Sequence, residues 1–271
     1  MNQSTTLPVG SQLRAWRQRR HLSQLDLSVD AEVSTRHLSF VETGRAMPSR
    51  EMVLRLANRL EVPLRERNRL LTAAGYAPMY AERPLSDPAL QAARDAVELV
   101  LKGHEPYPAL AIDRHWNLVS YNRAVPALLE GVAAELLQPP LNVLRLSLHP
   151  GGLAPRIVNL GQWRAHLLAR LRQQVAVSAD ATLAALADEL RGYPAPGESH
   201  SDVSEAAVVV PLQLVTPAGT LSFISTTTVF GTPVDITLSE LALETFFPAD
   251  AATATLLRAT LPRAEPVAPP P

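Results

Sequence analysis

The chain has 271 residues, of which 46% are hydrophobic and 19% charged, so it is long enough for two ordinary domains with well-packed cores. It contains no cysteine, which excludes disulfides, thiol catalysis and cysteine-ligated metal. It has no run of about 18 uncharged apolar residues, and its N-terminus lacks the pattern of a signal peptide. We therefore expect a cytoplasmic protein without membrane contact.

The net charge of −1 hides a difference between the two parts of the chain. Residues 1–80 contain 12 arginines and 7 acidic residues, whereas residues 81–271 contain 13 basic and 19 acidic residues. An arginine-rich coding bias would explain why Lys102 is the only lysine, but it would not explain this difference. A basic first part followed by an acidic remainder predicts a DNA-binding domain joined to a domain that does not bind DNA.

The first two helices are predicted from apolar spacing and a capping residue. Leu13 and Trp16 mark the apolar side of the first helix. Ser23 fits the N-cap of the second helix, because a serine hydroxyl accepts a hydrogen bond from the first free backbone amides. Its buried side is predicted to consist of Leu25 and Leu27, with Val29 or Ala31.

The third helix is predicted over residues 35–42, with Ser34 as its N-cap and Gly44 just past its end. Leu38 and Val41 lie three residues apart and are predicted to point inward. Two short helices joined by a tight turn, with a polar outer face on the second, form a helix-turn-helix, which places that second helix in the DNA major groove. The outward side chains are those of Thr35, Arg36 and Ser39.

Prolines and glycines delimit the rest of the first domain. A fourth helix is predicted to begin near Pro48-Ser49, and a fifth is predicted to begin at Pro63 and end at Gly75. Residues 76–90 contain three prolines, so they cannot form one helix. The predicted division is a first domain of residues 1–78, a linker of 79–90, a second domain of 91–262 and a disordered proline-rich tail of 263–271.

Residues 10–76 resemble the all-α, five-helix, lambda-repressor-like domain of Cro and Xre-type regulators. The residues that carry the resemblance are Gln24, Leu38, Val41-Glu42, Gly44-Arg45 and Pro48-Ser49. It implies that the start of the third helix contacts bases and that the flanking residues contact phosphates. The implied DNA-binding residues are Gln24, Ser34, Thr35, Arg36, His37, Ser39, Arg45 and Arg50.

Arg36 is the predicted main specificity contact, because an arginine can bond to guanine O6 and N7 together. Gln24, Arg45 and Arg50 are the predicted phosphate contacts. The alternative for any one of these residues is an ordinary solvated side chain. The resemblance also implies a salt bridge between Arg17 and Glu42.

Glu32 is a departure from the family pattern, because the turn of the motif usually has glycine there. A non-glycine residue in the left-handed conformation costs about 1–2 kcal/mol. Either Glu32 adopts that strained conformation, or the turn has another shape.

The second domain is predicted to begin with a helix over residues 89–102, which could pair with its twin in a dimer or simply cover this domain. Two strands, a helical region and three further strands then follow. The strands are predicted over 108–113, 118–121, 207–215, 219–229 and 233–245, and the helices over 141–148, 162–174 and 181–191. The short turns between the last three strands predict an antiparallel meander, so the domain is expected to be α+β. This order resembles a PAS domain, a sensor fold whose sheet surrounds a pocket.

Nearly all of residues 10–258 resemble Xre-type regulators with a C-terminal MmyB-like ligand-binding domain. The resemblance is carried by Tyr107–Asp113, Trp116-Asn117, Tyr121-Asn122, Asn142–Arg145, His149–Leu153, Ile157–Asn159, Leu221–Pro233 and Phe246–Asp250. It implies a PAS-like domain with an apolar cavity that can hold a fatty-acid-like molecule.

The cavity is expected to have apolar walls and a few polar groups that orient the ligand. The predicted ligand-binding residues are Leu110, Ile112, Trp116, Tyr121, Leu144, Arg145, Leu148, Trp163, Leu167, Phe223, Ser225 and Phe230. His149, Arg156 and Asn159 are further candidates, with Arg145, for binding a carboxylate or similar head group. The alternative for each is a role in the core or on the surface.

No motif in the chain indicates catalysis or a metal. The seven histidines lack the His-x-x-x-His spacing of a metal site, and no nucleophile-elbow motif accompanies the serines. A haem-based sensor, in which His149 or His166 binds the iron, is a disfavoured alternative. We therefore expect neither an enzyme nor a cofactor, apart from a bound fatty acid or similar apolar ligand.

The sequence predicts a transcriptional regulator that binds a double-stranded DNA operator as a homodimer and responds to a small-molecule ligand. One alternative is a constitutive DNA-binding protein whose second domain serves only for dimerisation or protein interaction. Another is an enzyme with an accessory DNA-binding domain.

Overall fold

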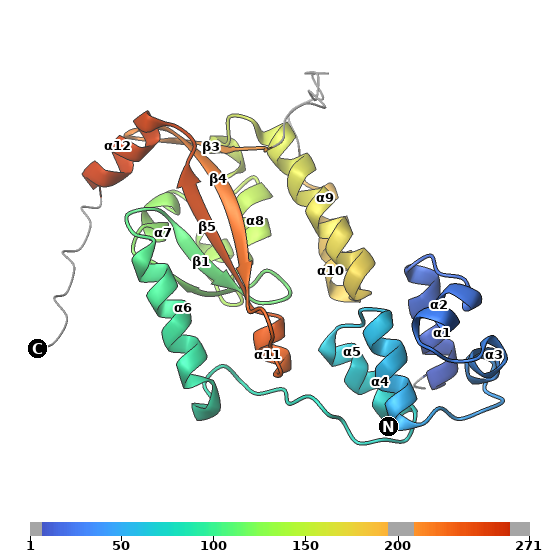
Figure 1. Cartoon of the computed structure of the whole chain (residues 1–271). Helices are drawn as coiled ribbons and strands as arrows, with labels where there is room; N and C mark the ends of the chain where they lie inside the picture. The colour runs from blue at the N-terminus through green and yellow to red at the C-terminus, as the bar shows by residue number, and fades with distance from the viewer. Residues whose placement is uncertain (1–6, 195–208, 261–271) are drawn as a thin grey trace, which may run out of the picture. The chain divides into compact units, whose positions relative to one another are not determined.

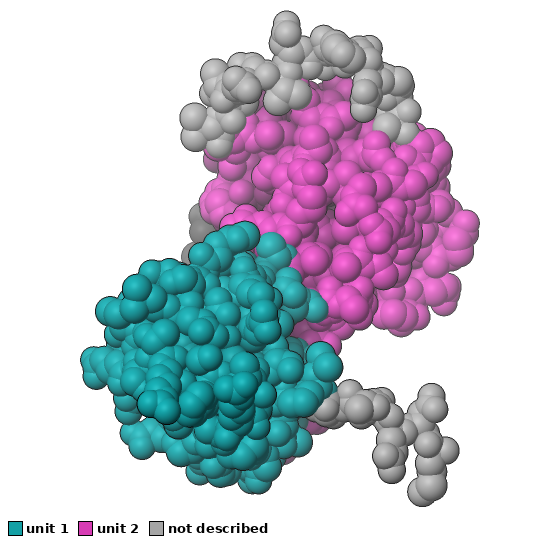
Figure 2. Space-filling model, turned by 90° about the vertical axis from the view of Figure 1, so that its right-hand side faces the viewer, with its two compact units in different colours: residues 1–83, 176–179, 232–239 teal, residues 84–175, 180–231, 240–271 magenta. Residues whose placement is uncertain are grey.

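The computed structural model describes residues 7–194 and 209–260 and divides the chain into two compact units. The first comprises residues 1–83, 176–179 and 232–239, and the second comprises the remainder (Figure 2). The predicted tail of residues 263–271, and the start of the strand predicted from residue 207, lie outside the described residues.

The first unit contains the five predicted helices (Figure 1). They are α1 (Val9–Arg19), α2 (Gln24–Asp30), α3 (Thr35–Glu42), α4 (Arg50–Arg59) and α5 (Leu64–Ala73). Their apolar sides share one core, in which Leu13, Leu38 and Leu56 are at most 1% exposed. The all-α, five-helix prediction is confirmed.

Two serines that were predicted as N-caps fulfil that role. The hydroxyl of Ser23 accepts from the amide of Asp26, and the Asp26 carboxylate accepts from the amide of Ser23, which forms a capping box. The hydroxyl of Ser34 accepts from the amide of His37. These bonds satisfy amides that have no partner inside the helix, so they determine where α2 and α3 begin.

The predicted buried side of α2 was wrong in one residue. Leu27 and Ala31, four residues apart, are at most 1% exposed, but Leu25 is 61% exposed. With 3.6 residues in each turn, a residue two positions before Leu27 lies on nearly the opposite side of the helix.

Gly10 allows α1 to approach α3 closely. A Cβ atom at this position would lie 2.0 Å from the carbonyl oxygen of Val41. No side chain fits in that space, so the position of α3 against α1 depends on this glycine.

The first residues of the predicted linker are held by α5. The Asn68 side chain accepts from the amides of Met79 and Tyr80 and donates to the carbonyl oxygen of Tyr80 at 2.7 Å. The same unit includes α11 (Ile236–Ser239), just after Asp235. Asp235 is 2% exposed and forms an ion pair with Arg83 at 2.9 Å.

The second unit is built on a five-stranded antiparallel sheet in the order β2-β1-β5-β4-β3. The strands are β1 (Ala109–Ile112), β2 (Leu118–Tyr121), β3 (Leu212–Thr216), β4 (Gly219–Val229) and β5 (Ala242–Pro248). The prediction of a last strand over 233–245 was wrong at its start, because that segment forms α11 before β5 begins. The pairing of β1 with β5 joins the first two strands to the last three.

Helices accompany the sheet (Figure 1). They are α6 (Gln91–Gly103), α7 (Val125–Leu128), α8 (Val143–Leu148), α9 (Leu160–Ser178), α10 (Ala181–Arg191) and α12 (Ala251–Thr260), with single 3-10 turns at Pro88–Leu90, Ala134–Leu137 and Ala154–Arg156. The α+β prediction is therefore confirmed.

The two faces of the sheet pack against different helices, because side chains alternate between the faces along each strand. Ala109 and Ala111 of β1 pack with Val97 and Leu101 of α6, so one face is closed by small and branched side chains. Leu110, on the other face, belongs to the large core shared with α8, α9 and α10. A cavity lies in that second core.

Candidate DNA interface and ligand cavity

A buried ion pair connects α1 to the end of α3. Arg17 Nε donates to Glu42 Oε1 at 2.7 Å, and Arg17 Nη2 donates to Oε2 at 2.8 Å; the two side chains are 10% and 1% exposed. Burial would raise the pKa of Glu42, but hydrogen bonds from Arg17 and Gln24 outweigh it, so the pKa lies below its ordinary value. The hydrogen bond with Glu42 raises the pKa of Arg17. The predicted salt bridge is confirmed.

Gln24, a predicted phosphate contact, is held by this ion pair. Its Nε2 donates to Glu42 Oε2 at 2.8 Å. The start of α2 and the end of α3 are thereby joined through one carboxylate. Contact of Gln24 with phosphate stays a prediction.

The turn of the helix-turn-helix contains Glu32 in a strained conformation. Glu32 has φ +54, in the left-handed region, and its exposed side chain does not compensate through burial. The structure therefore has the usual shape of this turn, with glutamate in place of glycine.

Two arginines, one on α3 and one in the loop after it, lie around one aromatic ring. The Cζ atoms of Arg36 and Arg45 lie 5.4 Å and 6.0 Å from the centre of the Phe40 ring. A cation over an aromatic face is attracted by the ring quadrupole, which reduces the freedom of these long side chains before DNA arrives. Phe40 was not predicted from the sequence, although its place four residues after Arg36 on one helix indicates that the two side chains can meet.

Thr35 is restrained by the preceding helix. Its Oγ1 lies 2.8 Å from the hydroxyl of Ser28, which itself donates to the carbonyl oxygen of Leu25. Because the Ser28 proton is used in that bond, Thr35 is the donor between the two hydroxyls. Toward DNA, Thr35 retains acceptor capacity, which suits an adenine or cytosine amino group.

The remaining predicted DNA contacts lie at the N-cap of α3, within α3 and at the start of α4. Ser34 caps α3, and its carbonyl oxygen accepts from the Leu38 amide. His37 and Ser39 are half-buried, whereas Arg50 is exposed. Their roles at DNA stay predictions.

The second unit contains an apolar cavity of about 100 Å³. Seven predicted residues line it, namely Leu110, Trp116, Leu144, Trp163, Leu167, Phe223 and Ser225. They come from two strands, two helices and the β1–β2 turn, so only the tertiary structure brings them together.

Five predicted ligand contacts do not line the cavity. Ile112 and Leu148 are packed in the surrounding core, and Phe230 packs on the α6 side of the sheet. Tyr121 is 51% exposed because alternation along β2 points it outward. Arg145 forms an ion pair with Glu189, at 2.7 Å between Nη2 and Oε2.

The other three head-group candidates have structural partners. Arg156 donates to the carbonyl oxygens of Leu128, Glu130 and Val215. Asn159 donates to the carbonyl oxygen of Pro211, and His149 Nδ1 accepts from the Gly151 amide at 3.0 Å. None of these three lines the cavity.

The charged part of the cavity wall was not predicted from the sequence. Arg170 on α9 and Glu244 on β5 both line the cavity. Arg170 lies three residues after Leu167, and Glu244 lies two residues before Phe246, which shares its face of β5. The signal that could have predicted these two residues is a single charged side chain on an otherwise apolar face of a helix or strand. The other missed lining residues are Pro108, Leu118, Val125, Leu128, Leu129, Val143, Leu146, Ser147, Leu153, Leu212, Leu214 and Phe246.

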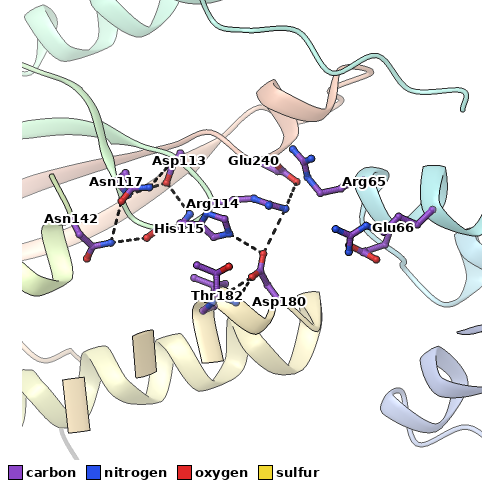
Figure 3. A network of polar contacts seen from close by, with 12 residues as sticks. Arg65, Glu66, Asp113, Arg114, His115, Asn117, Asn142, Asp180, Thr182 and Glu240 are labelled. Carbon is purple, nitrogen blue, oxygen red and sulfur yellow. Dashed lines mark hydrogen bonds and ion pairs between the residues drawn. The ribbon is translucent and has the colours of Figure 1, made fainter. Parts of the chain in front are cut away.

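A polar network holds the β1–β2 turn (Figure 3). This turn carries Trp116, which lines the cavity. Asp113 accepts from the amides of His115 and Asn117 and closes the β1–β2 turn. His115 Nε2 lies 3.0 Å from Asp180 Oδ2 at the start of α10, which anchors the turn. The turn gives Trp116 a φ of +67, and its indole donates to Gln174 at 2.7 Å.

Within residues 7–194 and 209–260, no group of three or more His, Asp or Glu side chains could hold a metal ion. Within these residues, no helix is long and apolar enough to cross a membrane.

Comparison with protein families gives two matches. Residues 93–259 match the MmyB-like transcription regulator ligand binding domain, and residues 8–70 match a helix-turn-helix domain. A comparison with curated proteins gives no match.

Proposed function

Because the chain belongs to the family of MmyB-like transcription regulators, we propose that a small molecule in the cavity of the second unit controls operator binding by α3. The protein is a DNA-binding transcription regulator with a ligand-binding domain. The observation that carries the proposal is the apolar cavity itself, whose wall includes strands, helices and a turn of one domain.

The proposed base contacts are Arg36 and Thr35, with Ser34, His37 and Ser39 beside them. Gln24, Arg45 and Arg50 are the proposed phosphate contacts. Arg36 is exposed and lies against Phe40, so it is available to a guanine in the major groove.

Selection of bound sequences from random DNA tests this part of the proposal. With the selected operator, Arg36→Ala should weaken binding by about 1–3 kcal/mol and relax specificity at one base pair. Arg69→Ala on α5 is the matched control and should change neither. Equal affinity of the Arg36 variant and the unaltered protein would contradict the assignment.

We also propose that the protein binds as a homodimer to a roughly two-fold operator, with half-sites about one helical turn apart. Footprinting together with the mass of the complex tests this. A single asymmetric site bound by one chain would contradict it.

The proposed ligand is small and apolar, and a fatty-acid-like molecule is one form of it. Ligand control requires different affinities for the DNA-binding and free states, so the ligand must shift operator affinity. Titration of the protein–operator complex with straight-chain acids and alcohols tests this. Unchanged operator affinity at saturating ligand would contradict ligand control.

The cavity is small, and this favours a second candidate function. In it, the second unit serves only for dimerisation or protein interaction. Native mass spectrometry of the purified protein separates the two. A bound small molecule supports the sensor, and a ligand-free dimer that no apolar compound affects supports the interaction module.

A further inference from the structure

The cavity wall contains one ion pair, formed by Arg170 and Glu244. Arg170 Nη1 donates to Glu244 Oε2 at 3.1 Å, and its Nη2 donates to Oε1. The hydroxyl of Thr227 also donates to Oε1, at 2.8 Å. The Arg170 and Glu244 side chains are 22% and 5% exposed, so the carboxylate is buried and well supplied with donors.

Trp116 restrains the same arginine from the cavity side. The Cζ of Arg170 lies 4.6 Å from the centre of a Trp116 ring. The guanidinium is therefore held between an aromatic face and a carboxylate, and moving it toward a ligand would disrupt both contacts.

These two residues are the charged members of the lining among the described residues, and their charges cancel. Ser147 and Ser225 add two hydroxyls, and Ser147 accepts from the Trp163 indole at 2.9 Å. His166, stacked on Trp163, adds no charge at pH 7, because burial and the positive charge of Arg170 lower its pKa.

An anionic ligand meets an unfavourable environment here. Its carboxylate would either lie beside the buried Glu244 carboxylate or take Arg170 from it, which would leave a buried charge unpaired. An uncharged oxygen can instead accept from a serine hydroxyl or from Arg170, or an alcohol can donate to Glu244 while the ion pair stays intact.

The size of the cavity restricts the ligand further. An engineered apolar cavity of about 150 Å³ holds benzene. The present cavity is about 100 Å³, so it admits a short or compact hydrocarbon body unless its walls move.

We propose that the ligand is a compact, uncharged, mainly apolar molecule whose single alcohol, carbonyl or amide group binds beside the Arg170–Glu244 pair. This inference rests on the proposed function, in which the cavity is the ligand site. It distinguishes an uncharged ligand from a fatty-acid carboxylate at the same site.

The test compares hexan-1-ol, hexanamide and hexanoate on the full-length protein at pH 7, with decanol and decanoate as a longer pair. Hexanamide matches hexanoate in shape and lacks its charge. Isothermal titration calorimetry gives the affinity, and fluorescence reports the site because Trp116 and Trp163 line the cavity. We expect each uncharged compound to bind at least about tenfold more tightly than the carboxylate of equal length.

Glu244→Gln sharpens the comparison. It removes the buried negative charge and leaves Arg170 able to bind an anion, so hexanoate should gain affinity relative to hexanamide. Glu189→Gln is the matched control, because it breaks the Arg145–Glu189 pair outside the cavity and should leave the preference unchanged.

The outcomes separate the two proposals. A preference for hexanoate or decanoate in the unaltered protein would overturn the uncharged ligand class and leave ligand control standing. Failure of every compound to bind would overturn both. The comparison in the unaltered protein decides the matter even if Glu244→Gln does not fold.

Discussion

Each unit of the protein contains a buried Arg–Glu pair, and the two pairs have different surroundings. Arg17–Glu42 lies within the helical core and is joined by Gln24, with protein on all sides of the carboxylate. Arg170–Glu244 lies in the wall of a cavity. The same kind of ion pair therefore fixes the position of a helix in one unit and forms the charged part of a cavity wall in the other.

The difference shows that burial alone does not indicate what an ion pair does. Breaking a pair enclosed by protein leaves a charge that neither water nor another group can solvate. Beside a cavity, a bound ligand can replace the missing partner. We therefore expect loss of Glu42 to reduce stability and loss of Glu244 mainly to change ligand preference.

The largest predicted effect is that of Glu42→Ala. It leaves Arg17 buried without its carboxylate and should reduce the stability of the first unit by about 3–5 kcal/mol. Hydrogen exchange of the amides in α1 and α3 measures this. Glu51→Ala is the control, because its pair with Arg55 is exposed, and it should cost less than about 1 kcal/mol. Equal losses of stability in the two variants would contradict the prediction that an enclosed ion pair contributes more than an exposed one.

The second prediction concerns the close contact between α1 and α3, the two helices that the Arg17–Glu42 pair joins. Gly10→Ala places a methyl group against the Val41 carbonyl and should separate α1 from α3, at a cost of about 1–3 kcal/mol. Operator affinity should fall as well, since α3 shifts. Gly161→Ala on α9 is the control, because a Cβ there meets nothing within 4 Å. Thermal unfolding and operator titration of both variants measure the effects.

Acid should weaken the enclosed pair. The pKa of Glu42 is lower in the folded protein than in the unfolded chain, so its stabilising contribution is complete above the unfolded value of about 4.3 and is lost as pH falls through the folded value. Protection of α1 and α3 against hydrogen exchange should therefore decrease as the pH falls below about 4.3. Glu42→Gln should show a smaller decrease, because it has already lost that contribution. An equal slope in both proteins would argue against this assignment.

The smallest predicted effect tests strain in the helix-turn-helix. Glu32→Gly relieves a left-handed φ that costs about 1–2 kcal/mol, but glycine loses about 0.5–1 kcal/mol through its greater freedom in the unfolded chain. The net gain should be up to about 1.5 kcal/mol, or a rise of a few degrees in Tm. Asp30→Gly, at the end of α2, should lower Tm instead.

The local features of the first unit were predictable because each depends on residues close in sequence. Ser23 and Ser34 cap helices through amides three residues later, and the positive φ of Gly44 follows from its place after α3. Gln24 was less predictable. Its partner Glu42 lies 18 residues away, so whether it contacts protein or DNA depends on packing.

The cavity was only partly predictable. Leu110, Phe223 and Ser225 follow from apolar alternation along strands. Tyr121 has a similar pattern but points outward, since β2 is an edge strand with one covered face. Arg145 was predicted and Arg170 was not, because no local pattern shows that Glu189 pairs with Arg145 or that Arg170 lines the cavity.

The sequence by itself determined the five-helix DNA-binding domain and the order of the five strands of the second domain, because caps, turns and apolar periodicity act over a few residues. It did not determine α11 or α12. Only the tertiary structure decided which charges are enclosed and which line a cavity. Arg170 and Glu244 are 74 residues apart in the chain and meet through the packing of α9 on the sheet, an arrangement that no local pattern specifies.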